Sequence, residues 1–211
     1  MLLSMLAFNL SAYDFMKDGI YYNYNNGSSG ASVTVTYESV DYDNYDFISD
    51  YTGNVIIPES VTYNGKPYSV TTIGDHAFSG CTSLTSVTIG NNVTSIGDHA
   101  FEDCTGLTSV TIGNNVTSID HEAFSGCTSL TSVYISDLAA WCDISFEDNP
   151  LFYAHHLYLN GEEVKDLVIP NSIPFISNYA FSGCTGLTSI TIPNSVISIG
   201  EMAFQNVFRD L

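Results

Sequence analysis

The chain has very little positive charge. Lys and Arg together number 4 in 211 residues against 23 Asp and Glu, which gives a formal net charge of −19. Nucleic-acid binding depends on Lys and Arg side chains that displace counterions from phosphates. We therefore expect neither a nucleic-acid partner nor attraction to an anionic membrane.

The sequence also lacks an apolar run long enough to span a bilayer. The short segment MLLSMLAFNLSA, residues 1–12, is typical of the apolar half of a secretory signal peptide. Its other interpretation is a hydrophobic segment that covers one end of the fold. We predict a signal-peptide remnant at 1–12 and no membrane insertion of the mature chain.

Signatures of catalysis are missing as well. The chain contains no G-x-S-x-G elbow, Walker loop, zincin motif, dinucleotide fingerprint or C-x-x-C pair. We therefore predict that it is not an enzyme and needs no cofactor.

What the chain does contain is a repeat. Four nearly identical stretches, of which the first reads IGDHAFSGCTSLTSVTIGNNVTS, begin at Ile73, Ile96, Ile119 and Ile176. The first three starts are 23 residues apart, a period typical of stacked solenoid coils. Each coil of a solenoid contacts only its neighbours, so the array builds a long surface rather than one deep pocket.

Each repeat predicts one strand. Leu84, Val87, Ile89 and Asn92 match the leucine-rich repeat pattern L-x-x-L-x-L-x-x-N. The alternation of apolar and hydroxyl residues predicts a buried strand face and an exposed one. The template recurs in six strand cores, at residues 55–57, 87–89, 110–112, 133–135, 167–169 and 190–192. We predict an α/β leucine-rich repeat solenoid of about six coils, with one parallel strand each and short helical turns.

Two irregular segments interrupt the period. The pairs Asn64-Gly65 and Asn160-Gly161 lie between apolar and aromatic residues, which is the strongest short-range signal for a tight β-hairpin. We predict hairpin insertions at about 61–70 and 137–164. Within the second, Asp137 is expected to cap a short helix that carries Trp141.

The remaining boundaries follow from this pattern. The solenoid is expected to extend from residue 53 to residue 211. Residues 13–52 have strand-like alternation and predict an N-terminal β cap over the open end of the stack.

Several residues recur at fixed repeat positions with an expected structural role. The amides of Asn92 and Asn115 are expected to satisfy backbone groups of the turn after the strand. A row of cysteines is expected to be small buried residues rather than a disulfide or metal ladder, because stacked side chains point in one direction instead of converging. This row comprises Cys81, Cys104, Cys127 and Cys184.

Two other clusters raise the question of a metal. A stripe of histidines and carboxylates recurs around His76, His99, His121 and Glu122. Such groups can bind a divalent ion, but these positions are variable and expected to face solvent. The acidic stretch 38–51, with Asp41, Asp43 and Asp46, lacks the features of an EF-hand loop. We predict no metal at either cluster.

The exposed strand face, together with the second insertion (Trp141–Asn160), is the candidate binding site. Its hydroxyl rows have two interpretations: a binding surface of the solenoid, or the ordinary preference of Thr for strands. Tyr134 interrupts the rows beside Trp141, and aromatic side chains of this kind can anchor a protein partner. The candidate binding residues are Ser86, Thr88, Ser109, Thr111, Ser132, Tyr134, Trp141 and Thr191.

The repeat pattern I-G-x-x-A-F-x-x-C-x-x-L-x-x-V-x-I-P-x-x-V resembles the BspA-like leucine-rich repeat family of bacterial surface antigens. The segments AYDFMKDGIYYNY, VIIPESVTYNGKPYSV and DLAAWC are also similar to that family. The resemblance implies a right-handed solenoid on a secreted or cell-surface protein. It further implies adhesion to extracellular-matrix or surface proteins such as fibronectin and fibrinogen, or bacterial co-aggregation. A glycan is a further candidate ligand of the same module. The alternative is a structural spacer that displays other domains of a longer surface protein.

Overall fold

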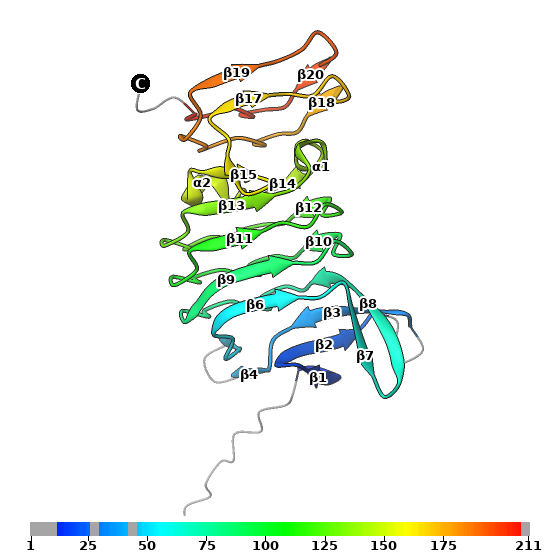
Figure 1. The fold of residues 1–211 in the computed structure, drawn as a ribbon. Coiled ribbons are helices and arrows are strands. Elements are labelled where there is room, and N and C mark those ends of the chain that lie inside the picture. The colour runs from blue at the N-terminus through cyan, green and yellow to red at the C-terminus, as the bar shows by residue number, and fades with distance from the viewer. Residues whose placement is uncertain (1–11, 26–29, 42–45, 208–211) are drawn as a thin grey trace, which may run out of the picture.

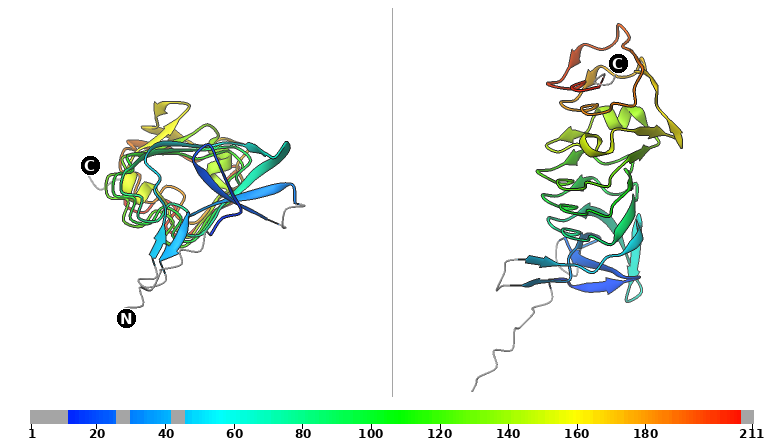
Figure 2. Two further views of the ribbon diagram at one scale, coloured as in Figure 1. Left: turned by 90° about the horizontal axis from the view of Figure 1, so that it is seen from below. Right: turned by 90° about the vertical axis from the view of Figure 1, so that its left-hand side faces the viewer.

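The computed structural model describes residues 12–25, 30–41 and 46–207. The expected signal segment up to residue 11 and Asp43 lie outside the described residues, as do the side chains of Asp41 and Asp46. In the described part, the chain winds into a stack of coils (Figure 1). Seen along the stack, successive coils largely superpose (Figure 2).

One face of the stack is a six-stranded sheet. Its strand order is β16-β15-β13-β11-β9-β6, and all neighbouring strands are parallel except the pair β15 and β16. The five parallel strands correspond to successive rungs, and β16 is the return strand of a hairpin. Their bounds are β6 (Gly53–Ile57), β9 (Leu84–Ile89), β11 (Ser109–Thr111), β13 (Ser132–Ile135), β15 (Leu157–Leu159) and β16 (Glu162–Glu163).

A second face is an eight-stranded sheet. Its main path is β1-β2-β3-β8-β10-β12-β14, and β7 pairs with β8 as an antiparallel hairpin that projects from the stack (Figure 1). The N-terminal strands β1 to β3 therefore continue this sheet at its edge. The bounds are β1 (Phe15–Lys17), β2 (Ile20–Tyr24), β3 (Ser32–Thr36), β7 (Ser60–Tyr63), β8 (Lys66–Ile73), β10 (Ser95–Ile96), β12 (Ser118–Ile119) and β14 (Ser145–Phe146).

The other elements are short. Two parallel pairs close the C-terminal end, and one antiparallel pair lies near the N-terminus. These pairs are β17 (Asp166–Val168) with β19 (Ser189–Thr191), β18 (Phe175–Ile176) with β20 (Ser198–Ile199), and β4 (Ser39–Asp41) with β5 (Asp46–Ile48). The helices are α1 (Leu138–Cys142) and α2 (Leu151–Ala154). Asp137 caps α1 as predicted, since its carboxylate accepts from the backbone N–H groups of Ala139 and Ala140.

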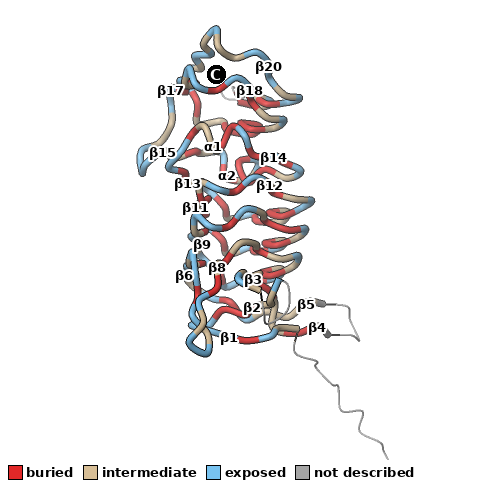
Figure 3. Tube along the Cα trace, turned by 90° about the vertical axis from the view of Figure 1, so that its right-hand side faces the viewer, coloured by how far each residue is buried: buried red, intermediate tan, exposed pale blue. Residues whose placement is uncertain are grey.

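The core is a column of repeated side chains inside the coils. Buried residues recur from coil to coil along the chain trace (Figure 3). The rings of Phe78, Phe101 and Phe124 stack with centroid separations of 4.8 and 5.1 Å, close to the spacing of adjacent strands. The Cys104 thiol donates to the Phe78 carbonyl, and the Cys127 thiol donates to the Phe101 carbonyl. All five cysteines are buried and free, so the repeated thiols bind adjacent coils without a disulfide.

The amide ladder differs from the prediction. Asn92 donates from Nδ2 to the Glu59 carbonyl at 3.0 Å. Asn115, however, is exposed, and its side chain makes no hydrogen bond within the described part of the chain. The inter-coil contact comes from the preceding position instead, because Asn91 Oδ1 accepts from the Asn114 backbone N–H at 3.0 Å. The structural role expected of Asn115 is therefore corrected.

The second irregular segment also differs. It was expected to leave the stack, but β14 pairs in parallel with β12, and β15 pairs in parallel with β13. Residues 137–159 therefore form a full rung, with α1 and α2 in place of the usual turns. Only the β15–β16 hairpin, which turns at Asn160-Gly161, departs from the parallel order.

Candidate binding surface

The hydroxyl residues of the six-stranded sheet form two rows in register. Ser86 is paired with Ser109, and Ser109 with Ser132, across β9, β11 and β13. The second row joins Thr88, Thr111 and Tyr134 across the same strands. These six predicted residues are thus brought together on one face.

The register adds residues that the sequence analysis missed. Asn54 and Ile56 of β6 continue the two rows at one end, and Ile56 is 69% exposed. Tyr158 of β15 continues the second row beyond Tyr134. A signal for Tyr158 was present, because Leu157-Tyr158-Leu159 has the same alternation as Val133-Tyr134-Ile135.

An aromatic pair marks the end of the second row. The rings of Tyr134 and Tyr158 stack with centroids 4.7 Å apart and an angle of 26° between their planes. Both residues are half-buried. Stacked rings on parallel strands lose little side-chain freedom on binding, and tyrosines are enriched in protein interfaces. This pair therefore places a preordered aromatic contact at the end of the second row.

The hydroxyls of the face differ in whether they are already hydrogen-bonded within the protein. Asn54 Oδ1 accepts from the hydroxyls of Thr85 and Ser86 at 2.9 and 2.8 Å. The hydroxyls of Thr88 and Thr111 make no hydrogen bond to any described residue. The row of Thr88 and Thr111 therefore presents donors and acceptors to solvent, next to the tyrosine pair.

A charged cluster borders the tyrosine pair. Glu163 of β16 is the register partner of Tyr158, and its Oε1 lies 2.7 Å from His156 Nδ1. The hydrogen bond with His156 holds the pKa of the Glu163 carboxyl below its usual value, assisted by Lys165 at 3.4 Å. The carboxylate thus remains ionised at the edge of the face.

Trp141 is not part of this surface. Its side chain is 1% exposed, and its indole N–H donates to the Ala180 carbonyl at 2.8 Å. The helix α1 turns the ring into the core, where it packs 4.9 Å from the ring of Phe146. The predicted role of Trp141 as a binding anchor is therefore wrong, because the rung that carries it belongs to the stack.

Thr191 is exposed but lies apart from the other predicted residues. It belongs to β19, which pairs only with β17 among the described strands. Its register partner is Val168, which is 60% exposed. The row of hydroxyls therefore does not extend in one sheet to Thr191.

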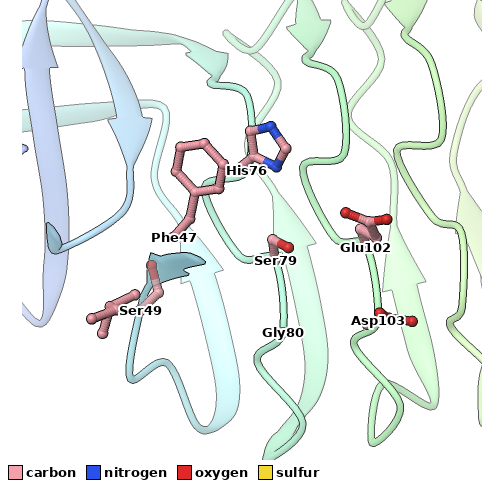
Figure 4. A pocket seen from close by; sticks show the side chains of 8 residues that line it. Phe47, Ser49, His76, Ser79, Gly80, Glu102 and Asp103 are labelled. Atoms are coloured by element: carbon pink, nitrogen blue, oxygen red, sulfur yellow. The ribbon is translucent and has the colours of Figure 1, made fainter. Parts of the chain in front are cut away.

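A groove lies elsewhere on the stack, along the turns that follow the eight-stranded sheet. It has a volume of about 510 Å³ and is lined by Phe47, Ile48, Ser49, His76, Ser79, Gly80, Glu102 and Asp103. Figure 4 shows the Phe47 ring against the His76 ring, with Glu102 on the next coil. The two rings stack with centroids 3.8 Å apart. His76 is half-buried rather than fully exposed as expected, because the Phe47 ring packs against it.

The family model of the BspA type leucine rich repeat region matches residues 43–156 and 154–209, with 6 copies. The chain belongs to the BspA-type leucine-rich repeat family. Repeat proteins of this kind are generally binding scaffolds rather than catalysts, and the comparisons indicate no enzyme family.

Solved structures of other leucine-rich repeat proteins resemble this one. A leucine-rich cell surface protein from Faecalibacterium prausnitzii A2-165 is 27% identical, with a TM-score of 0.53 over 90% of this chain. This chain spans 45% of that protein. A leucine-rich repeat protein from Bacteroides capillosus ATCC 29799 is also 27% identical, with a TM-score of 0.51 over 70% of this chain and 98% of its own.

A leucine-rich repeat protein of T. pallidum shares the fold, with a TM-score of 0.52 at 20% identity over 88% of this chain and 85% of its own. A search of curated proteins finds no match. Among the described residues of this BspA-type chain, no helix has both the length and the apolar character that a membrane crossing requires.

Proposed function

We propose that the chain is a non-enzymatic, secreted or cell-surface module that binds a protein partner through the outer face of its six-stranded sheet. The observation that carries this proposal is the row of Thr88, Thr111, Tyr134 and Tyr158, held in register by parallel strands. A structural relative described as a cell surface protein supports the location.

The composition of the face favours a protein ligand. Exposed Ile56 and the stacked Tyr134 and Tyr158 offer apolar and aromatic contact at its two ends, and unpaired hydroxyls lie between them. Interface cores are typically built from such aromatic groups surrounded by polar ones. The net charge of −19 favours a partner with a basic surface, because complementary charge speeds encounter and excludes acidic partners. Adhesion to matrix proteins such as fibronectin or fibrinogen is the specific form we infer.

We also infer a right-handed stack of about six coils, with residues 13–52 as its N-terminal cap. A crossover connection between two parallel strands of one sheet is right-handed in almost all proteins. This chain repeats that connection between β9, β11 and β13.

The test is binding to immobilised fibronectin and fibrinogen, measured by surface plasmon resonance, with a glycan array for the alternative ligand. Tyr134→Asp and Thr111→Asp place a charge in the middle of the face. We expect each to weaken binding at least about thirtyfold, as loss of an interface hot spot of about 2 kcal/mol does. Asn115→Asp adds the same charge at an exposed turn and should bind like the wild type.

The outcomes separate the alternatives. If Tyr134→Asp, Thr111→Asp and Asn115→Asp all bind like the wild type, the binding site lies away from this face. Glycan binding without protein binding would change the ligand class. A wild-type protein that binds neither would favour a structural spacer. Circular dichroism of each variant checks that the stack is intact.

A further inference from the structure

Three metal-ligating side chains meet on the turns that follow β10 and β12. His99 Nδ1 lies 3.2 Å from Glu102 Oε2 and 3.5 Å from Glu122 Oε2. One ligand atom from each of these residues lies within 4.8 Å of the other two. The cluster is separate from the six-stranded sheet and adjoins the groove through Glu102.

The stack brings these residues together. His99 and Glu102 lie on one turn, and Glu122 occupies the position of His99 on the next turn. His99 and Glu122 have positive φ angles of 54° and 51°, a conformation that directs both side chains the same way from successive coils. The His99 ring is held parallel to the His76 ring, with centroids 4.9 Å apart. The imidazole is therefore oriented before any ligand arrives.

The key nitrogen has no partner of its own. His99 Nδ1 is buried and makes no hydrogen bond to any described residue. The two nearby carboxylates fall within ion-pair distance but lack hydrogen-bond geometry, so they do not satisfy the ring nitrogen. Two carboxylates beside a buried, unsatisfied nitrogen form an arrangement that a cation would stabilise.

Contrary to the sequence-based prediction of no metal at this stripe, we propose that His99, Glu102 and Glu122 bind one divalent transition-metal ion of the Zn²⁺ type. Imidazole and carboxylate are the donors that such ions take in proteins. Ligand atoms about 2.0–2.2 Å from one ion lie about 3–4 Å from each other, which matches the two measured distances. Two carboxylates with neutral imidazole balance the charge of the ion.

The neighbouring groups support this assignment. His121 Nε2 lies 3.6 Å from Glu122 Oε1, where it can orient that carboxylate or supply a further ligand. The net charge of −19 raises the local concentration of cations around the chain. An ion at this position joins two successive coils, because its ligands come from both.

The test uses Zn²⁺ alone, added to protein that has been dialysed against EDTA. Isothermal titration should show one saturable site per chain, and the thermal midpoint should rise with Zn²⁺ because the ion binds only the folded state. Glu102→Gln and Glu122→Gln should each weaken binding at least about tenfold. Glu162→Gln removes the same charge from the exposed tip of the β15–β16 hairpin and should bind like the wild type.

Two further measurements distinguish loss of the metal site from loss of folding and identify the ligand type. Thermal midpoints in EDTA show whether each Gln variant folds as the wild type does, and Gln keeps the size of Glu. Replacement of Zn²⁺ by Co²⁺ reports nitrogen and oxygen ligands through its visible absorption. Absence of saturable binding by the wild type, or Gln variants that bind like the wild type, would overturn the proposal.

Discussion

At the residue scale, burial determines the chemistry of the cysteines. Desolvation raises the pKa of Cys81 to about 11 and those of Cys127, Cys142 and Cys184 to about 12. The pKa of the Cys104 thiol is raised for the same reason. The thiolate is the reactive form, so these groups are protonated and shielded in the folded chain.

We therefore predict that the native protein does not react with Ellman's reagent at pH 8, and that all five thiols react after denaturation in guanidinium chloride. The reaction is followed by absorbance with and without denaturant. Rapid labelling of one or more thiols in the native protein would show that the core opens at the corresponding coil.

Single residues also show a limit of sequence reasoning. The stripe of His76 and His99 was expected to face solvent, because the repeat places both in a turn. The structure covers His76 with Phe47 from β5, which is distant in the sequence. Such a contact depends on how the N-terminal segment folds back onto the stack, and the repeat pattern contains no information about it.

At the scale of elements, the turns after β9 and β11 are each tied to the next coil by the amide of their first Asn. Asn91 Oδ1 accepts from the Asn114 N–H, and Asn114 Oδ1 accepts from the Ser136 hydroxyl at 2.8 Å. The two adjacent Asn residues of each GNN turn are therefore not equivalent. Leucine-rich repeat spacing pointed to the second Asn of the turn. Both turns use the first Asn to reach the next coil. Of the two second Asn residues, only Asn92 makes a side-chain hydrogen bond within the described part of the chain, to the Glu59 carbonyl of the preceding coil.

We predict that Asn91→Ala lowers the free energy of unfolding by about 1 kcal/mol, the usual contribution of one hydrogen bond. Asn115→Ala, at an exposed position, should change it by less than about 0.5 kcal/mol. Chemical denaturation of both variants measures the difference. Equal losses would mean that Asn115 makes a contact in solution equivalent to that of Asn91.

The strands were predictable where the repeat is regular. Val87, Val110 and Val133 occupy one register position in adjacent strands, as their spacing indicates. The sequence did not predict the rung from α1 to β15, because this rung lacks Asn and Cys at the fixed positions of the repeat. Helices also replace its turns. The tight Asn160-Gly161 pair then suggested that the whole segment was an insertion, although only its end departs from the parallel order.

At the scale of the whole molecule, charge is spread along an elongated stack. Four basic residues cannot neutralise 23 acidic ones, so like charges repel in the folded state. Added salt screens this repulsion, because the Debye length falls from about 30 Å at 0.01 M to about 8 Å at 0.15 M.

We predict that raising NaCl from about 0.01 to 0.15 M in EDTA increases the thermal midpoint by about 2–4 °C, which corresponds to about 1 kcal/mol for a chain of this size. Differential scanning calorimetry measures the change. Choline chloride at the same ionic strength should have the same effect, since screening does not depend on the cation. A midpoint that stays constant or falls would contradict net self-repulsion.

The two long sheets end at one level of the stack. Beyond it, β17 and β18 pair only with β19 and β20 among the described strands. Among the described residues, the two parts are joined by a small set of hydrogen bonds. Trp141 and Asn149 donate to the Ala180 carbonyl, Asn149 also donates to the Tyr179 carbonyl, and His155 Nδ1 lies 3.0 Å from the Gly183 carbonyl. The backbone N–H groups of Ser177 and Gly186 donate to the carbonyls of Cys142 and His155. Where the two long sheets are continuous, many backbone hydrogen bonds between adjacent coils share a pulling force. At the junction before β17 and β18, fewer hydrogen bonds between described residues share it. Under tension along its length the molecule therefore has a built-in breaking point, where the last coils separate while the coils before them remain folded.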